Sequence, residues 1–201
     1  MINDFLRIAV ACFFLTSCAQ SEIGVQSDED GATAELSDVA SEKKRWSLNV
    51  WRIGQQDFDV TFYAPKVSID RFVDKHERYY RLERHQRFSV SLNFAKPNCA
   101  GEQNAQAHIK CLLGKIKDNP HLQIDENTIS QIAHKDGKIL TYISIVGKGT
   151  HKMKIINTHV VFERSGRWGD FHASILQPTH REFLTMLKFP SLVSINERDE
   201  P

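Results

Sequence analysis

The 201-residue sequence lacks several features by which common classes of protein are recognised. Its N-terminal apolar run, Ile8 to Leu15, is far shorter than the about 20 residues that a helix needs to cross a bilayer. No Gly-x-Ser-x-Gly motif is present, so nothing supports a serine hydrolase. The four cysteines include no Cys-x-x-Cys pair, and the nine histidines include no His-x-His or His-x-x-x-His spacing. These absences argue against a redox enzyme and against a compact zinc motif.

A targeting segment begins the chain. Arg7 precedes the apolar run, whose length is typical of a signal peptide, and Leu15-Thr16-Ser17-Cys18 closes it. These four residues resemble the lipobox of bacterial lipoprotein precursors. The resemblance implies a signal peptide over residues 1–17, cleavage before Cys18, a diacylglycerol on the Cys18 thiol, and a fatty acid such as palmitate on its new amino group. The alternative, a short buried helix ending in a chance cysteine, fits poorly because the residues that follow are polar.

The same resemblance implies a location. Ala19 follows the cysteine, and lipoproteins of Gram-negative bacteria without Asp at that place are usually carried to the outer membrane. Two or three acyl chains anchor a protein stably, whereas one chain is marginal. We therefore expect a lipid-anchored protein of the cell envelope, held in the bilayer through acylated Cys18, at the outer membrane and facing the periplasm.

Charge is distributed unevenly along the chain. Residues 19–42 carry seven acidic residues and no Lys, Arg or aromatic residue. Such a segment cannot bury enough apolar surface to fold, which predicts a disordered acidic tether over residues 18–45. Residues 45–201, by contrast, carry 23 basic and 17 acidic side chains, a net charge of +6. This charge suits an anionic envelope component or an acidic protein, and it is too small to indicate nucleic acid.

Processing would leave two cysteines in the folded part. Cys12 belongs to the signal peptide and Cys18 would be lipidated, so Cys99 and Cys111 remain. In the oxidising periplasm such a pair favours a disulfide bond. The alternative is two independent buried thiols.

Residues 46–196 have room for one domain with a single core. Polar and apolar residues alternate most clearly over Phe88–Phe94, and turn signals at Asp136-Gly137 and Ser165-Gly166 predict two consecutive hairpins. Apolar residues at helical spacing predict helices over Ala105–Lys117 and Pro178–Leu187. The sequence thus predicts a single α+β domain, a mostly antiparallel sheet of six or seven strands with two or three packed helices, and a charged tail at 197–201. The other expected strands are 46–53, 58–62, 128–133, 138–146, 153–163, 167–176 and 191–195.

A second resemblance concerns this domain. The order of its strands, the stretch Gly166-Arg-Trp-Gly-Asp-Phe-His-Ala-Ser174 and the closing amphipathic helix are similar to small envelope domains of the PsbP/Mog1-like type, over about residues 46–196. Members of that group mostly act as accessory or binding proteins. The resemblance therefore implies no active-site residues.

Asp170 and His172 form the main candidate for chemistry. In a strand they share one face, so Asp170 could orient His172 for acid–base catalysis. An ordinary surface contact between them is the competing interpretation, and the one that we favour. His159 and His172 lie on successive predicted strands and could meet across a hairpin, but a metal site needs three or four ligands. We assign no metal ligands, no cofactor and no catalytic residues.

A basic segment is the main candidate for binding. Arg71, Lys75, Arg78, Arg81, Arg84 and Arg87 recur every three or four positions and would form a stripe if the segment were helical. Such a stripe would suit phosphate or carboxylate groups on a lipid or partner protein. The interleaved Asp74, Glu77 and Glu83 instead favour a solvated face with local ion pairs.

Taken together, the residues favour a non-catalytic protein over an enzyme. We expect a membrane-anchored periplasmic lipoprotein that acts as a binding or accessory protein toward an unknown envelope protein or anionic envelope component, and not toward nucleic acid. Two alternatives stay open. One is an envelope hydrolase that uses Asp170 and His172, and the other is an immunity or inhibitor lipoprotein.

Overall fold

The structure of the chain is a computed structural model that describes residues 46–53, 58–75, 78–96, 99, 104–147 and 151–198. The predicted signal peptide, Cys18 and the predicted tether lie outside the described residues. So do the last three residues of the predicted charged tail.

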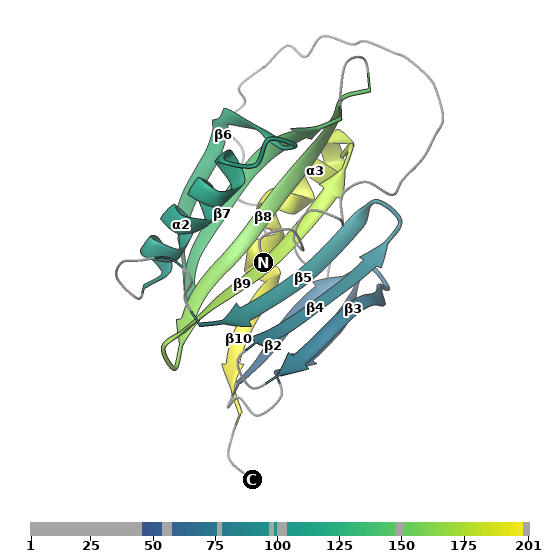
Figure 1. The fold of residues 1–201 in the computed structure, drawn as a ribbon. Coiled ribbons are helices and arrows are strands. Elements are labelled where there is room, and N and C mark those ends of the chain that lie inside the picture. The colour runs from purple at the N-terminus through teal and green to yellow at the C-terminus, as the bar shows by residue number, and fades with distance from the viewer. Residues whose placement is uncertain are drawn as a thin grey trace, which may run out of the picture.

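The described residues form ten strands, two α-helices and one 3₁₀ helix (Figure 1). Helix α2 and the hairpin strands lie where the sequence predicts them. In chain order the elements are β1 (Ser47–Arg52), β2 (Phe58–Ala64), β3 (Ser68–Lys75), β4 (Arg78–His85), β5 (Phe88–Ala95), α2 (Ala105–Lys117), β6 (Gln123–His134), β7 (Gly137–Val146), β8 (Met153–Arg164), β9 (Arg167–Leu176), α3 (His180–Lys188), η2 (Phe189–Leu192) and β10 (Val193–Glu197).

The strands form two sheets where the sequence predicts one. The larger has seven strands in the order β3-β4-β5-β9-β8-β7-β6, and the smaller has three in the order β1-β2-β10. All neighbouring strands in both sheets are antiparallel. The expected α+β class and mostly antiparallel sheet are confirmed. The strands that the sequence does not predict are β3 and β4, which residues 68–85 form. The second sheet forms because the predicted strands β2 and β10 pair with each other, more than 130 residues apart in the chain.

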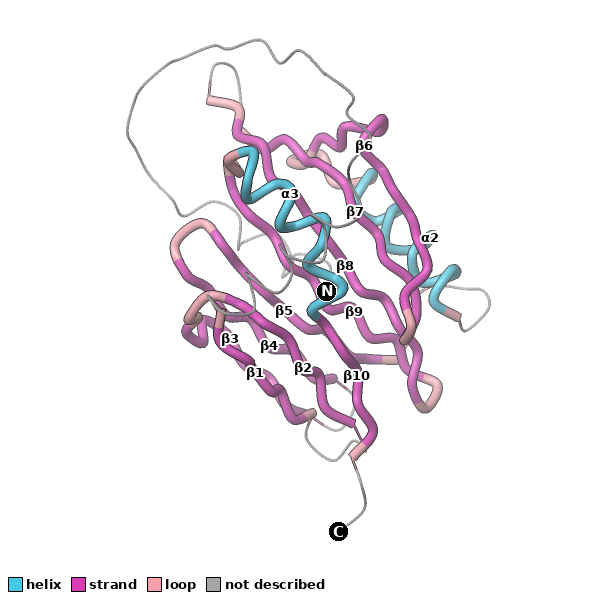
Figure 2. The backbone as a smooth tube through the Cα atoms, turned by 180° about the vertical axis from the view of Figure 1, so that it is seen from behind, coloured by secondary structure: helices cyan, strands magenta, loops and turns pink. Residues whose placement is uncertain are grey.

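Three layers result from this arrangement (Figures 1 and 2). Helix α2 lies on one face of the seven-stranded sheet, over β6, β7 and β8; we call this the front face. The smaller sheet and helix α3 cover the opposite, back face. Neither helix is long and apolar enough to cross a membrane.

The main core lies between the two sheets and is largely aromatic. Every second residue of β2 is fully buried, and Phe58 and Phe62 contact rings from the larger sheet. The ring centroids of Phe58 and Phe94 lie 5.1 Å apart, and those of Phe62 and Phe171 lie 4.8 Å apart. Aromatic pairs at such separations add to the free energy of area burial, so this layer is expected to dominate the stability of the domain.

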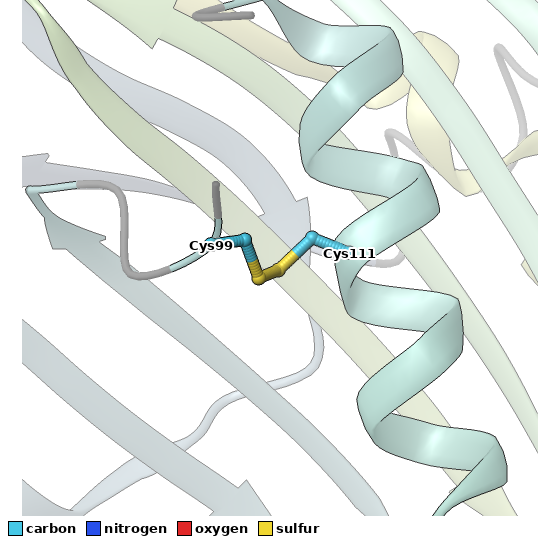
Figure 3. Close-up of a disulfide and its surroundings, with 2 residues drawn as sticks. All are labelled: Cys99 and Cys111. Atoms are coloured by element: carbon cyan, nitrogen blue, oxygen red, sulfur yellow. A yellow bond between two sulfur atoms is a disulfide. The ribbon is translucent and has the colours of Figure 1, made fainter. Parts of the chain in front are cut away.

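A smaller core lies between α2 and the front face. Ile109 of α2 packs with Leu140, Tyr142 and Val161 from β7 and β8. The side chain of Asn104 caps the helix by accepting a hydrogen bond from the Ala107 backbone N–H at 2.9 Å. The predicted disulfide is present: Cys99, beyond the end of β5, is bonded to Cys111 of α2, with 6.2 Å between their Cα atoms (Figure 3). The bond fastens the helix to the β5 side of the sheet.

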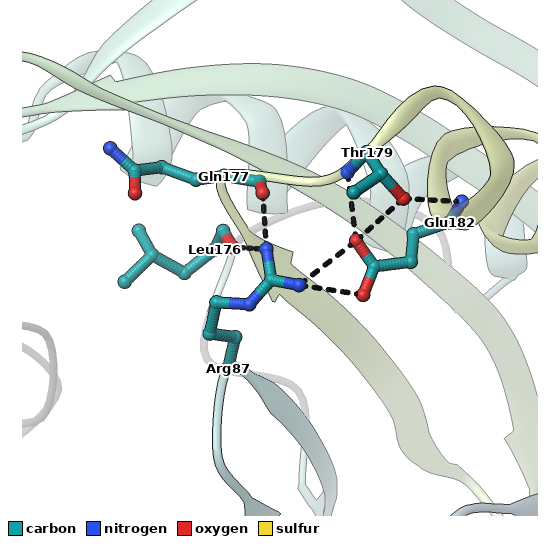
Figure 4. A network of polar contacts seen from close by, with 5 residues as sticks. All are labelled: Arg87, Leu176, Gln177, Thr179 and Glu182. Carbon is teal, nitrogen blue, oxygen red and sulfur yellow. Dashed lines mark hydrogen bonds and ion pairs between the residues drawn. The ribbon is translucent and has the colours of Figure 1, made fainter. Parts of the chain in front are cut away.

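One ion pair joins the β4–β5 turn to the start of α3 (Figure 4). The Arg87 guanidinium donates to the Leu176 carbonyl at 3.2 Å and to the Gln177 carbonyl, and its Nη2 lies 2.8 and 3.1 Å from the two Glu182 oxygens. Glu182 also accepts from the backbone N–H of Thr179, in a capping box. Burial alone would raise the pKa of Glu182, but the hydrogen bonds from Thr179 and the Arg87 charge lower it.

Gly169 in β9 is required by close packing against Phe162 of the neighbouring strand. A Cβ atom at Gly169 would lie 2.0 Å from the Phe162 ring. That ring is 1% exposed and is held between Phe58 and Phe94, with centroid separations of 5.8 and 6.1 Å. It therefore has little freedom to move away.

We expect Gly169→Ala to lower the free energy of unfolding by about 1–3 kcal/mol, because the added methyl group overpacks the core. Gly114→Ala is the matched control: nothing lies within 4 Å of a Cβ there, and alanine in a helix interior should stabilise by about 0.5–1 kcal/mol. Chemical denaturation measures both. Equal stability of Gly169→Ala and the parent chain would contradict this packing.

Candidate functional site

A row of polar side chains crosses the front face at its centre. Strand β9 alternates, so that Trp168, Asp170, His172 and Ser174 face front while Gly169, Phe171, Ala173 and Ile175 face the aromatic core. The neighbouring strand β5 repeats this pattern with Ser89, Ser91 and Asn93 in front. Because side chains alternate between the two faces of a strand, β5 and β9 are polar on the front face and apolar on the back face.

Strand register brings two histidines and an aspartate together. His159 of β8 and His172 of β9 are direct cross-strand partners, and their rings stack with 4.1 Å between centroids. The meeting of these histidines across the hairpin is thus confirmed. His159 Nδ1 lies 2.8 Å from a carboxylate oxygen of Asp170.

Further polar groups extend this contact into a network. The Tyr142 hydroxyl lies 3.3 Å from His159 Nε2, and His172 Nε2 lies 3.1 Å from the Asn157 side-chain oxygen. The Asn157 amide in turn donates to the Ser144 hydroxyl at 2.9 Å. We call these six residues the polar network: Tyr142, Ser144, Asn157, His159, Asp170 and His172.

The expected pairing of Asp170 with His172 is not the one that forms. Asp170 makes its hydrogen bond to His159, while His172 bonds to Asn157. The surface interpretation of this pair also fails, because the Asp170 side chain is only 14% exposed and that of His159 only 4%. The direct partner of Asp170 on β8 is Val161, and His159 is a diagonal cross-strand neighbour on the same face. Diagonal neighbours are within reach of long side chains, so the partner of Asp170 comes from the adjacent strand.

Burial and charge set the protonation states of the network. Burial alone would raise the pKa of Asp170, but the neighbouring His159 imidazole lowers it to about 2, so the carboxylate stays ionised. Burial, together with the nearby His159, lowers the pKa of His172 to about 3. Burial also raises the pKa of Tyr142. At neutral pH the site therefore presents an ionised carboxylate, a neutral His172 and a protonated phenol.

Helix α2 borders the site through a second stacked pair. The His108 ring lies over Trp168 of β9, with 4.5 Å between centroids and planes inclined by 17°. Sequence reasoning did not identify His108, Tyr142 or Asn157, because each lies far along the chain from Asp170. Only the alternation of Asn157 with His159 in β8 marks Asn157 as facing the same side.

The basic segment does not form a helical stripe, because residues 68–85 form the strands β3 and β4. Four of its members, Arg71, Lys75, Arg78 and Arg84, do share the front face. Arg71 and Arg78 lie over the Tyr80 ring, at 5.9 and 5.6 Å from its centroid.

The other two members of the basic segment lie elsewhere. Arg81 is on the back face, over Trp51 at 4.9 Å, where it pairs with Glu83. Arg87 belongs to the turn contact of Figure 4. Arg84 pairs with Asp70 at 3.3 Å. Local ion pairs of the expected kind are thus present.

Among the residues that the structure describes, no group of three or more His, Cys, Asp and Glu side chains is placed to hold a metal ion. The site presents hydrogen-bonding groups around the ionised Asp170 carboxylate, within a surface that also carries serine and asparagine side chains from β5.

Comparisons with known proteins do not assign the chain to a family. No family model matches the sequence, and no curated protein matches it. The similarity to PsbP/Mog1-like domains therefore stays a prediction. Solved structures that match include the crystal structure of LpqN, described as involved in cell envelope biogenesis of Mycobacterium tuberculosis. It has 12% sequence identity, covers 76% of this chain and 79% of that chain, and has a TM-score of 0.36. A TM-score this low carries no argument about function.

The lowered pKa of His172 predicts a pH dependence of stability. The unfolded chain binds a proton at this residue below its ordinary pKa of 6.5, whereas the folded chain binds it only near 3. The stabilisation is therefore complete above pH 6.5 and is lost as the pH falls toward 3. Asp170 adds a further loss only between its ordinary 3.8 and about 2.

We expect His172→Gln to flatten the dependence of the free energy of unfolding on pH between 6.5 and about 4. Denaturant titrations at a series of pH values measure it. His121→Gln, at an exposed histidine in the turn after α2, should leave the slope unchanged. A His172→Gln slope equal to that of the parent would show that this histidine titrates normally.

Proposed function

We propose that the chain is a lipid-anchored accessory protein of the bacterial cell envelope that binds an envelope component on the front face of β5 and β9. The observation that carries the binding role is the row of partly exposed polar side chains that β5 and β9 present on one face, where Ser91 is the cross-strand partner of His172 and Asn93 that of Asp170. Asp170 is bonded to His159, and His172 to Asn157, which fixes their positions beside this row.

The hydrolase alternative receives less support from this geometry. The chain of contacts from Asp170 through His159 ends at the Tyr142 hydroxyl. Tyr142 is 3% exposed and its pKa is raised, which makes it a poor nucleophile. His172, with a pKa of about 3, is a weak general base at neutral pH. An immunity or inhibitor role differs from the proposed one only in the partner.

The anchor part of the proposal rests on Leu15-Thr16-Ser17-Cys18 and the acidic segment that follows. A lipidated cysteine followed by a self-repelling segment would hold a domain at the bilayer while leaving it free to reach a partner. Ala19, the residue after the cysteine, supports placement at the outer membrane, facing the periplasm. The Cys99–Cys111 disulfide supports an oxidising compartment.

Metabolic labelling with an alkyne analogue of palmitate tests the anchor. The parent chain should be labelled and should sediment with membranes, whereas Cys18→Ser should lose the label and leave a soluble or unprocessed chain. Cys12→Ser, in the same apolar run, is the matched control and should keep both label and sedimentation. Retention of the palmitate label by Cys18→Ser would contradict lipidation at this residue.

Photocrosslinking in intact cells tests the binding face. A p-benzoylphenylalanine placed at Ser91, which lies opposite His172 on the front face, should give a discrete adduct with an envelope component. The same group at Ser194, on the outer side of the smaller sheet, should give none. Adducts of equal yield at both positions would contradict a specific role of the front face.

A further inference from the structure

Helix α3, on the back of the domain (Figure 2), presents two leucines on its outer side. Its exposed residues recur every three or four positions and are His180, Arg181, Leu184 and Leu187, which we call the α3 stripe. Leu184 is 43% exposed and Leu187 is 45% exposed, whereas Met186 on the inner side belongs to the aromatic core. Residues three apart on a helix are neighbours, so the two leucines form one apolar contact surface.

Positive side chains border this apolar surface at both ends. Arg181 lies in the first turn of α3, and Lys188 is its last residue. The acidic residue of the helix, Glu182, is held by Arg87 and Thr179 in the contact of Figure 4. Long cationic side chains can keep their charged ends among lipid headgroups while their stems cover apolar surface. Leucines bordered by cations are therefore typical of a helix that lies at the surface of a bilayer.

The described chain begins beside α3. Trp46, its first residue, lines the same cleft as Arg181 and Thr185 of the helix, and the volume of this cleft is about 210 Å³. The Trp46 ring also contacts Phe189, directly after the helix, with 6.0 Å between centroids. The part of the sequence that precedes Trp46, with the anchor proposed at Cys18, therefore joins the domain next to α3.

The stretch between the proposed anchor and the domain is short. Residues 19–45 could span at most about 100 Å, so a bilayer that holds acylated Cys18 would lie within that distance of Trp46. A surface held so close is met at a high effective concentration, and even a weak contact is then populated. Lys43, Lys44 and Arg45 directly precede Trp46 and would add to the attraction by an anionic bilayer surface.

A second copy of the chain fits the α3 stripe less well. Two α3 helices packed antiparallel would place Arg181 of one against Lys188 of the other. Packed in parallel, they would place each cation against its own counterpart. Like charges repel each other in both arrangements, whereas lipid phosphates would attract them.

We propose that the α3 stripe docks on the surface of the bilayer that holds the anchor. Leu184 and Leu187 enter the interface, and Arg181 lies among lipid phosphates. The contact involves α3 and not the smaller sheet, where Ser194 lies. This proposal rests on the lipid anchor proposed above. Its consequence is an orientation: the front face, on the other side of the larger sheet, is turned away from the bilayer and toward a partner.

Fluorescence quenching locates α3 relative to the bilayer. The full-length lipidated protein carries Leu184→Cys, labelled there with the environment-sensitive dye NBD. It is reconstituted in vesicles of phosphatidylethanolamine and phosphatidylglycerol, with and without lipids brominated in the upper part of their acyl chains. We expect the dye at position 184 to lose most of its fluorescence to the brominated lipids. His121→Cys, labelled in the same way in the exposed turn after α2, should keep its fluorescence.

Substitutions in the labelled protein test which side chains hold the helix at the bilayer. Leu187→Gln keeps a good helix former but removes apolar surface, and about half of this side chain is left to bury. The ratio of docked to undocked protein, measured by quenching, should therefore fall roughly three- to tenfold. Leu187→Met is the matched control and should leave the ratio unchanged.

The charge at the start of the helix is tested in the same way. Arg181→Gln should lower the ratio of docked to undocked protein roughly fivefold on vesicles that contain phosphatidylglycerol, because one cation is lost near an anionic surface. Lys110→Gln, at an exposed lysine of α2, is the matched control and should leave the ratio unchanged.

Several results would overturn the proposal. Absence of quenching at position 184 would mean that the stripe stays in water, and equal quenching at position 121 would mean that no face of the domain is preferred. An unchanged ratio in Leu187→Gln would assign the contact to other residues. NBD emission that depends on the density of protein in the vesicles would assign the stripe to a second copy.

Failure of the docking can be told apart from failure of the proposed function. If these results came with a palmitate label on Cys18 and a specific Ser91 adduct, the docking would be wrong but the anchor and the binding face correct. Absence of the palmitate label from the parent chain would instead contradict the anchor, and absence of the Ser91 adduct would contradict the binding face.

Discussion

The seven-stranded sheet carries the smaller sheet and α3 on its back face and α2 over β6, β7 and β8 on its front face, and this constraint governs the arrangement of the domain. Strand β9 must present alternate side chains to two different environments, one aromatic and one polar. Phe171 packs on Phe62 at 4.8 Å on the back face, while Asp170 bonds to His159 at 2.8 Å on the front face. A shift of one residue in register would exchange these environments and place the carboxylate among phenylalanine rings. The polar network and the aromatic core therefore specify the same strand register from opposite sides.

Local sequence signals predicted the elements in which neighbouring residues decide the structure. The alternation over Phe88–Phe94, the helical spacing over Ala105–Lys117 and the two hairpin turns all correspond to observed elements. Strands β3 and β4 were missed because arginines at intervals of three suggested a helix. In the structure Arg78 and Arg84 lie on the same face of β4 as Tyr80 and Leu82, which are both buried. Arg81 lies on the opposite face. The second sheet was missed because β2 and β10 meet only in the folded chain, and no local pattern contains that pairing.

The candidate site shows the same limit at the level of single residues. Sequence reasoning identified Asp170, His159 and His172, since polar residues in alternating strands are conspicuous. It assigned the wrong partner to Asp170, because the nearest candidate along the chain was two residues away. The true partner depends on the offset between β8 and β9, which the turn at Ser165-Gly166 determines. Ser165 and Gly166 both have positive φ there, 51° and 68°, as a tight hairpin turn requires.

The disulfide has a consequence for how firmly helix α2 holds His108 over Trp168. Cys111 lies one helical turn after His108, so the bond to Cys99 restrains the part of α2 that carries this histidine. The strands can assemble the polar network without that bond, whereas the position of His108 over Trp168 depends on how firmly the helix is held. Reduction of the Cys99–Cys111 bond would therefore loosen the stacking of His108 on Trp168 before it disturbed the strands.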